Sequence, residues 1–137
     1  MSEKQTWQNL KWAIDKVKGV HYQRIEDALT AGIPDLMLCY QGKVIFVELK
    51  QRDAFPKRPA TPVRIGFKPA QYLWITKHQK AGGKAVMLSQ VGRDYYLHEH
   101  CLQHIRDETL SAKEFRNSAV MHSRTTMEIV RYLLEVL

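Results

Sequence analysis

Residues 32–50 of the chain read Gly-Ile-Pro-Asp-Leu-Met-Leu-Cys-Tyr-Gln-Gly-Lys-Val-Ile-Phe-Val-Glu-Leu-Lys. Two apolar runs flank the central Gln-Gly pair, a pattern that predicts a β-hairpin. Counted outward from that pair, Asp35 and Glu48 each lie six positions away, so antiparallel pairing places the two carboxylates opposite one another. Lys50 shares a strand face with Glu48 because side chains alternate along a strand. The hairpin therefore predicts two carboxylates and an ammonium group at one end of two neighbouring strands.

Such a group of side chains suits hydrolysis of a phosphodiester bond. Two carboxylates this close repel each other unless a cation lies between them. Hard oxygen ligands favour Mg²⁺ or Mn²⁺, which also accept phosphate oxygens and water as further ligands. A lysine two residues beyond the glutamate can orient or help deprotonate a metal-bound water, or neutralise charge in the transition state.

The rest of the chain predicts an α/β fold, a central mixed sheet flanked by helices. Apolar residues at a spacing of three or four predict a helix over 3–18 that Gly19 ends. The other expected elements are a strand over 20–29, a long loop over 51–67, a helix over 68–81, a buried strand over 84–88, a short edge strand over 94–97 and an extra C-terminal helix.

Length and charge limit the classes of protein. The chain has 137 residues, enough for one domain over 1–137, and its 21 Lys and Arg against 14 Asp and Glu give a net charge of +7. Such an excess is found both in merely soluble proteins and in proteins that bind nucleic acid. No apolar run approaches the ~20 residues of a membrane span, and residues 1–5 do not resemble a signal peptide. Together with only two cysteines, Cys39 and Cys101, this predicts a cytoplasmic protein with no membrane partner.

The motifs resemble those of the PD-(D/E)xK nuclease superfamily, and more specifically of the VRR-NUC family, the virus-type replication-repair nucleases. The residues that carry the resemblance are Gly32-Ile33-Pro34-Asp35, Glu48-Leu49-Lys50, Gln71 and Gly82-Gly83-Lys84. The resemblance covers about residues 3–98 and implies a restriction-endonuclease-like core, which leaves about 99–137 as a C-terminal helical extension.

The resemblance also implies an activity and a site. It implies an endonuclease that needs Mg²⁺ or Mn²⁺ and no organic cofactor, acting in DNA replication or repair, in a bacterial cell or a phage-infected host. The implied site residues are the metal ligands Asp35 and Glu48, the main-chain carbonyl of Leu49, the catalytic Lys50, the helper Gln71, and a further metal ligand at Glu3 or, alternatively, Glu26. Small stand-alone members of the family resemble structure-specific nucleases that act as homodimers on branched DNA such as Holliday junctions or flaps, and the resemblance implies the same for this chain.

The loop after the second hairpin strand is basic. Its cations are Arg52, Lys57, Arg58, Arg64 and Lys68. Their place directly after the expected catalytic strand favours a phosphate-binding segment over a solubilising loop. Phe55 and Phe67 in the same segment either stack on unpaired bases or anchor the loop to the core.

Several alternatives remain open at this point. The chain could be a catalytically inactive DNA-binding module, a structural protein that binds acidic partners, or an exonuclease or restriction-type nuclease of the same superfamily. The segment His98–Cys101 with His104 carries possible zinc ligands, but no second ligand pair is visible, so a solvated segment is favoured.

Overall fold

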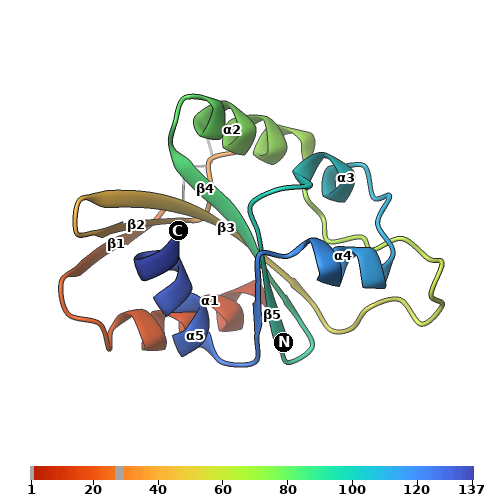
Figure 1. Ribbon diagram of the computed structural model, residues 1–137, viewed down its shortest axis with the longest axis horizontal. Helices are drawn as coiled ribbons and strands as arrows, with labels where there is room; N and C mark the ends of the chain where they lie inside the picture. The colour runs from red at the N-terminus through yellow and green to blue at the C-terminus, as the bar shows by residue number, and fades with distance from the viewer. Residues whose placement is uncertain (1, 27–29) are drawn as a thin grey trace.

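The computed structural model describes residues 2–26 and 30–137, and it contains one mixed β-sheet. The strands follow one another across the sheet in chain order: β1 (Val20–Arg24), β2 (Leu36–Tyr40), β3 (Lys43–Arg52), β4 (Lys84–Val91), β5 (Asp94–His98) and β6 (Met121–Ser123). Only β3 and β4 pair in parallel, and all other neighbours are antiparallel (Figure 1). The predicted α/β class with a mixed sheet is confirmed.

The β2–β3 hairpin has the predicted turn and register. Gln41 and Gly42 both have positive φ, 49° and 81°, which is the geometry that matches the twist of a two-residue hairpin. Leu36 lies opposite Val47. One position further along this register, Asp35 faces Glu48.

One face of the sheet, the α1 face, is covered by helices from the two ends of the chain. These are α1 (Glu3–Ile14), α5 (Thr126–Arg131) and the π-helical turn η1 (Tyr132–Val136). Their buried side chains, such as Leu10 and Ile129, pack against odd-numbered residues of β3 and even-numbered residues of β4. In Figure 1 α1 and α5 lie together below the sheet.

The opposite face, the α2 face, carries the remaining helices. They are α2 (Pro69–Lys80), α3 (Leu102–Arg106) and α4 (Ala112–Ser118), with the loop 53–68 beside them. Ile65, Ile75, Met87 and Phe115 are buried in the core on this side. Glu48 and Lys50 project into this layer, because they alternate along β3 with core residues of the α1 face.

Some predicted boundaries were wrong. The strand expected over 20–29 ends at Arg24, and residues 27–29 lie outside the described residues. The strand expected to lie at the sheet edge, β5, is an inner strand because β6 pairs with its outer side. The segment 99–137, expected to be helical, contains β6 as well as α3 and α4, and all three are too short to leave a clear periodic pattern.

Within the described ranges, no helix combines the length and the apolar character that crossing a bilayer requires. Cys39 and Cys101 are both free thiols, half-buried and exposed respectively.

Candidate active site

Asp35 stands just before β2, and its carboxylate is held by the neighbouring strand. Its Oδ2 accepts a hydrogen bond from the backbone N–H of Leu49 at 2.9 Å. The backbone carbonyl of Asp35 accepts from the N–H of Ile25 at 2.8 Å and from Nη1 of Arg24 at 3.0 Å. Asp35 is thus fixed between β1 and β3, with its side chain turned toward the second carboxylate.

The surroundings of Gly32 explain why the Gly-Ile-Pro-Asp motif begins with a glycine. Its φ is +87°, and a Cβ at this position would overlap the backbone carbonyl of Ala70 in the first turn of α2. Only a residue without a side chain allows the loop before β2 to come this close to the helix. The contact brings the segment that carries Asp35 beside the turn that carries Gln71.

Glu48 is the centre of the site. It is 2% exposed, and its Oε2 lies 3.2 Å from Nε2 of Gln71, which donates to it, and 3.4 Å from Nζ of Lys50. Its Oε1 is buried and has no hydrogen-bond partner among residues 2–26 and 30–137. A buried carboxylate oxygen without a partner is costly unless a ligand completes it.

Gln71 is held at both ends of its amide. Its Oε1 accepts a hydrogen bond from the backbone N–H of Lys68 at 3.0 Å, so the side chain closes the first turn of α2. Its Nε2 is thereby turned toward Glu48. The sequence alone leaves this position as an ordinary helix residue, and only the family resemblance suggested it.

The protonation of Glu48 follows from these surroundings. Burial, reinforced by the negative charge of Asp35, raises the pKa of Glu48 from 4.5 to about 8, although the Lys50 ammonium opposes the rise. At neutral pH the carboxyl therefore holds a proton in the absence of a cation. A divalent cation between the carboxylates would replace that proton.

The residues present fit a divalent cation of the Mg²⁺ or Mn²⁺ type. Asp35, just before β2, and Glu48, on the adjacent β3, offer oxygen atoms, and Oε1 of Glu48 lacks any other partner within the described part of the chain. The main-chain carbonyl of Leu49 stays a predicted third ligand. Within those same ranges, no cluster of three or more His, Cys, Asp or Glu side chains is placed to hold a metal.

Glu3 and Glu26, the two alternatives for a further ligand, share a different pocket. They line it together with Trp7 of α1 and Arg24 of β1. Arg24 and its neighbour Tyr22 pack on Trp7, which places this pocket on the α1 face, whereas Glu48 projects to the α2 face. A metal-binding role for either glutamate stays a prediction.

The basic segment is divided between shaping the loop and facing solvent. Arg52 donates to the backbone carbonyls of Arg64 at 2.9 Å and Gln51 at 2.8 Å, so it ties the two ends of the loop together. Arg64 pairs with Glu108 at 3.2 Å. Lys57, Arg58 and Lys68 are exposed. DNA binding by these five cations stays a prediction.

Two roles were expected for Phe55 and Phe67, stacking on unpaired bases or anchoring the loop to the core, and their contacts in the structure are those of an anchor. Phe55 packs edge-on against Tyr96 and Phe115, with ring centroids 5.5 and 5.7 Å apart. Phe67 is only 5% exposed. Both rings fix the loop to the core of the α2 face.

Two buried polar residues near the site were not found by sequence reasoning. Ser89 lies beside Lys50 in the parallel register, is fully buried, and its Oγ lacks a hydrogen-bond partner within the described ranges. His98, expected in a solvated segment, is instead fully buried, with Nε2 2.8 Å from the carbonyl oxygen of Phe115, and burial lowers its pKa to about 4. The only sequence signal was a polar residue inside each apolar strand.

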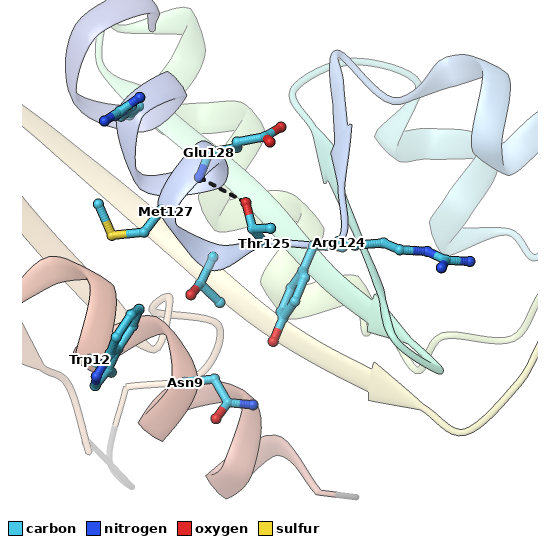
Figure 2. Close-up of a pocket in the computed structure, with 9 residues that line it drawn as sticks. Asn9, Trp12, Arg124, Thr125, Met127 and Glu128 are labelled. Atoms are coloured by element: carbon cyan, nitrogen blue, oxygen red, sulfur yellow. Dashed lines mark hydrogen bonds between the residues drawn. The ribbon is translucent and has the colours of Figure 1, made fainter.

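A large cavity, about 560 Å³, lies away from the carboxylates. Figure 2 shows it between α1, with Trp12 and Asn9, and the start of α5, with Thr125 and Met127. This cavity belongs to the α1 face. The candidate site is thus defined by side-chain chemistry rather than by the size of a cavity.

The mixed sheet with helices on both faces has a restriction-endonuclease-like α/β fold. The structure is similar to that of Archaeoglobus fulgidus Hjc, a Holliday junction resolvase from an archaeal hyperthermophile, with a TM-score of 0.56 and 12% sequence identity, over 93% of this chain and 94% of that chain. No family model and no curated protein matches the sequence. The predicted fold is confirmed, and membership of the VRR-NUC family stays a prediction.

Proposed function

We propose that this protein is a divalent-metal-dependent endonuclease that hydrolyses phosphodiester bonds in branched DNA. The observation that carries the proposal is the pair formed by Asp35, just before β2, and Glu48 on β3, with a buried Glu48 oxygen left without a partner in the described structure and Lys50 beside it. The likeness of the fold to a Holliday junction resolvase supports the choice of a branched substrate.

Each site residue has a role in this proposal. Asp35 and Glu48 would hold Mg²⁺ or Mn²⁺, with the Leu49 carbonyl as a further ligand. When bound, the cation supplies a Lewis acid and a water of lowered pKa. Gln71 holds Glu48 in place through its amide, and the Lys50 ammonium neutralises negative charge that develops on the phosphate.

The partners follow from charge and from the substrate. A net charge of +7 and the exposed cations Lys57, Arg58 and Lys68 favour binding to a polyanion. A junction has two strands to cut, so a homodimer with two sites suits it. Within the PD-(D/E)xK nuclease superfamily, we infer that the protein belongs to the VRR-NUC family.

The test is a cleavage panel. A synthetic four-way junction, a flap and a linear duplex are incubated with the protein and Mg²⁺, Mn²⁺ or EDTA. We expect metal-dependent cutting of the branched substrates, and loss of cutting with retained binding in Glu48→Gln. Glu135→Gln, a change of the same chemistry at an exposed position on η1, is the matched control and should cut normally.

Two outcomes would decide against this function. Binding without cleavage by the unmodified protein under all metal conditions would favour the DNA-binding module. Equal cutting of the linear duplex would favour an exonuclease or a restriction-type enzyme.

A further inference from the structure

A buried serine with an unpartnered hydroxyl lies beside Lys50. In the parallel register Ser89 of β4 is the neighbour of Lys50 of β3, and these two strands adjoin each other in Figure 1. Ser89 follows Met87 by two residues, and Met87 belongs to the core of the α2 face, so the Ser89 side chain projects to the same face as Lys50. Ser89 is fully buried and Lys50 is 6% exposed. The hydroxyl and the ammonium group are therefore enclosed in one layer of the protein.

The Ser89 hydroxyl is costly in this position. Its Oγ is one of three buried side-chain atoms that lack a hydrogen-bond partner within residues 2–26 and 30–137, together with Oε1 of Glu48 and Nδ1 of His98. A buried hydroxyl without a partner destabilises the folded state, and an alanine would avoid this loss at almost the same volume. Lys50 is next to both unpartnered oxygen atoms, with Glu48 along β3 and Ser89 across on β4. The cost therefore falls at the candidate active site, where a second state of that site can offset it.

The ammonium group of Lys50 has donors to spare. Its Nζ lies 3.4 Å from Oε2 of Glu48, longer than the about 2.7–2.9 Å of a short charge-assisted hydrogen bond. An ammonium group carries three N–H donors, and the contact with Glu48 uses at most one of them. Lys50 can therefore donate to a second acceptor without losing its place on β3.

The neighbour of Ser89 on its other side is turned away from it. Tyr96 of β5 lies beside Ser89 in the antiparallel register. Its ring stacks on His122 of β6, with centroids 4.7 Å apart, and packs edge-on against Phe55. Because β6 lies on the side of β5 away from β4, the tyrosine ring leans away from Ser89. Lys50 is thus the neighbouring group that can donate to the Ser89 hydroxyl.

A cation held by Asp35 and Glu48 would change the surroundings of the ammonium group. The carboxylate charge that attracts Lys50 would be neutralised, and the two positive charges would repel each other. The Lys50 ammonium would then turn from Glu48 toward an uncharged acceptor. A serine hydroxyl has two lone pairs, and Ser89 is already placed on the adjacent strand.

We propose that Ser89 is a positioning residue for Lys50. When Glu48 binds the cation, the Ser89 hydroxyl accepts a hydrogen bond from Lys50 and holds the ammonium group where it meets the negative charge of the phosphate. This inference deepens the proposed function and rests on it. In the metal-free protein the hydroxyl has no such partner, so Ser89 lowers the stability of that state and favours the metal-bound one.

The first test uses no DNA. Urea unfolding is measured in EDTA and in saturating Mg²⁺ for the unmodified protein, Ser89→Ala and Ser89→Cys, of which the last keeps most of the serine volume but is a poor acceptor. In EDTA, Ser89→Ala should unfold at a higher urea midpoint than the unmodified protein, because an unpartnered buried hydroxyl is removed. Mg²⁺ should raise the midpoint of the unmodified protein by more than that of either variant.

Ser123→Ala is the matched control for a buried serine. The Ser123 hydroxyl donates to Glu128 and accepts from the backbone N–H of Thr125, both at 3.0 Å, on the far side of the sheet from β3. Its removal should lower the urea midpoint equally in EDTA and in Mg²⁺. A crystal structure with Mn²⁺ should in addition place Oγ of Ser89 within about 3.2 Å of Nζ of Lys50.

The second test is cleavage of the four-way junction. Ser89→Ala and Ser89→Cys should each lower kcat about thirtyfold and change KM by less than about twofold, because the ammonium group is misplaced while DNA binding is intact. Ser123→Ala should cut at the rate of the unmodified protein. A serine that only fills space would show the reverse, with kcat kept in Ser89→Cys and the midpoint lowered in Ser89→Ala.

The outcomes separate this inference from the nuclease assignment. An unchanged kcat in both Ser89 variants, equal gains in midpoint from Mg²⁺ in all three proteins, or a Mn²⁺ structure in which Lys50 does not contact Ser89 would each overturn the role of Ser89. If the unmodified protein binds the cation but cuts no DNA, the proposed function fails. The unfolding and crystallographic results then still decide whether Ser89 receives the Lys50 ammonium.

Discussion

Replacing Glu48 by Gln should stabilise the metal-free protein, and the gain should grow with pH. In the folded protein the pKa of Glu48 is raised from 4.5 to about 8, chiefly by burial and next by the charge of Asp35. Between these two values the folded state keeps a proton that the unfolded state has lost. The free energy of unfolding of the unmodified protein therefore falls as pH rises from 4.5 to about 8, and levels off above that.

The magnitude follows from the size of the rise. At about 1.4 kcal/mol for each pH unit, the difference between 4.5 and about 8 corresponds to on the order of 5 kcal/mol once Glu48 is fully ionised. Gln cannot ionise but has nearly the same shape. The variant should thus escape this loss, while the two proteins have similar stability where the glutamate is protonated.

The assay is urea unfolding in EDTA, followed by tryptophan fluorescence from about pH 5 to about pH 9. We expect the variant to exceed the unmodified protein by a margin that widens up to about pH 8. Glu135→Gln, at an exposed position, should follow the unmodified protein at every pH. Adding Mg²⁺ should restore the alkaline stability of the unmodified protein and leave the Glu48 variant unchanged. Parallel curves for Glu48→Gln and the unmodified protein would refute the reasoning that burial and Asp35 hold a proton on Glu48.

Three other changes test separate parts of the structure. Gly32→Ala should lower the unfolding free energy by on the order of 2 kcal/mol or more and reduce cleavage, because the new Cβ would overlap the backbone of Ala70. Gly19→Ala is the control, since Gly19 also has positive φ but a Cβ there would meet no atom within 4 Å, so this variant measures the backbone strain alone. Thermal melts that are equal for the two variants would contradict the overlap. Burial lowers the pKa of His98 from 6.5 to about 4, so the unfolded state takes up a proton before the folded state does as the pH falls. The unfolding free energy should therefore drop by on the order of 3 kcal/mol between pH 6.5 and about pH 4. A His98→Gln variant that shows the same drop in an acid titration would contradict this role of His98. Arg52→Ala removes the bonds that tie the following loop, so limited proteolysis should cut that loop faster, and unchanged protection would argue that the aromatic anchors suffice.

The hairpin could be predicted because its information is local. The Gln41-Gly42 turn and the alternation on either side set the register, and the register alone brings Asp35 opposite Glu48. The same counting placed Lys50 on the face of Glu48, and Nζ of Lys50 lies 3.4 Å from Oε2 of Glu48. These residues are close in sequence, so no knowledge of the remaining fold was needed.

The other features depend on contacts between distant segments. β6 has three residues and is a strand only because it pairs with the free edge of β5. Three residues are too few to show a periodic pattern, so the sequence does not predict this strand. The position of Gln71 at Glu48 requires Gly32 to pack on α2, which is a tertiary contact. The high pKa of Glu48 depends on how deeply the α2 layer buries it, and the sequence carries no measure of that burial.

The hairpin has a consequence for the order of folding events. Asp35 and Glu48 are brought together by a short turn, and hairpins of this kind close in microseconds, before pairings between distant strands. The pairing of β3 with β4 must first close the long connection through α2. We therefore expect the two carboxylates to meet while water still surrounds them and screens their repulsion. The cost of burying Glu48 would arise only in the last step, so alkaline pH should accelerate unfolding more than it slows refolding.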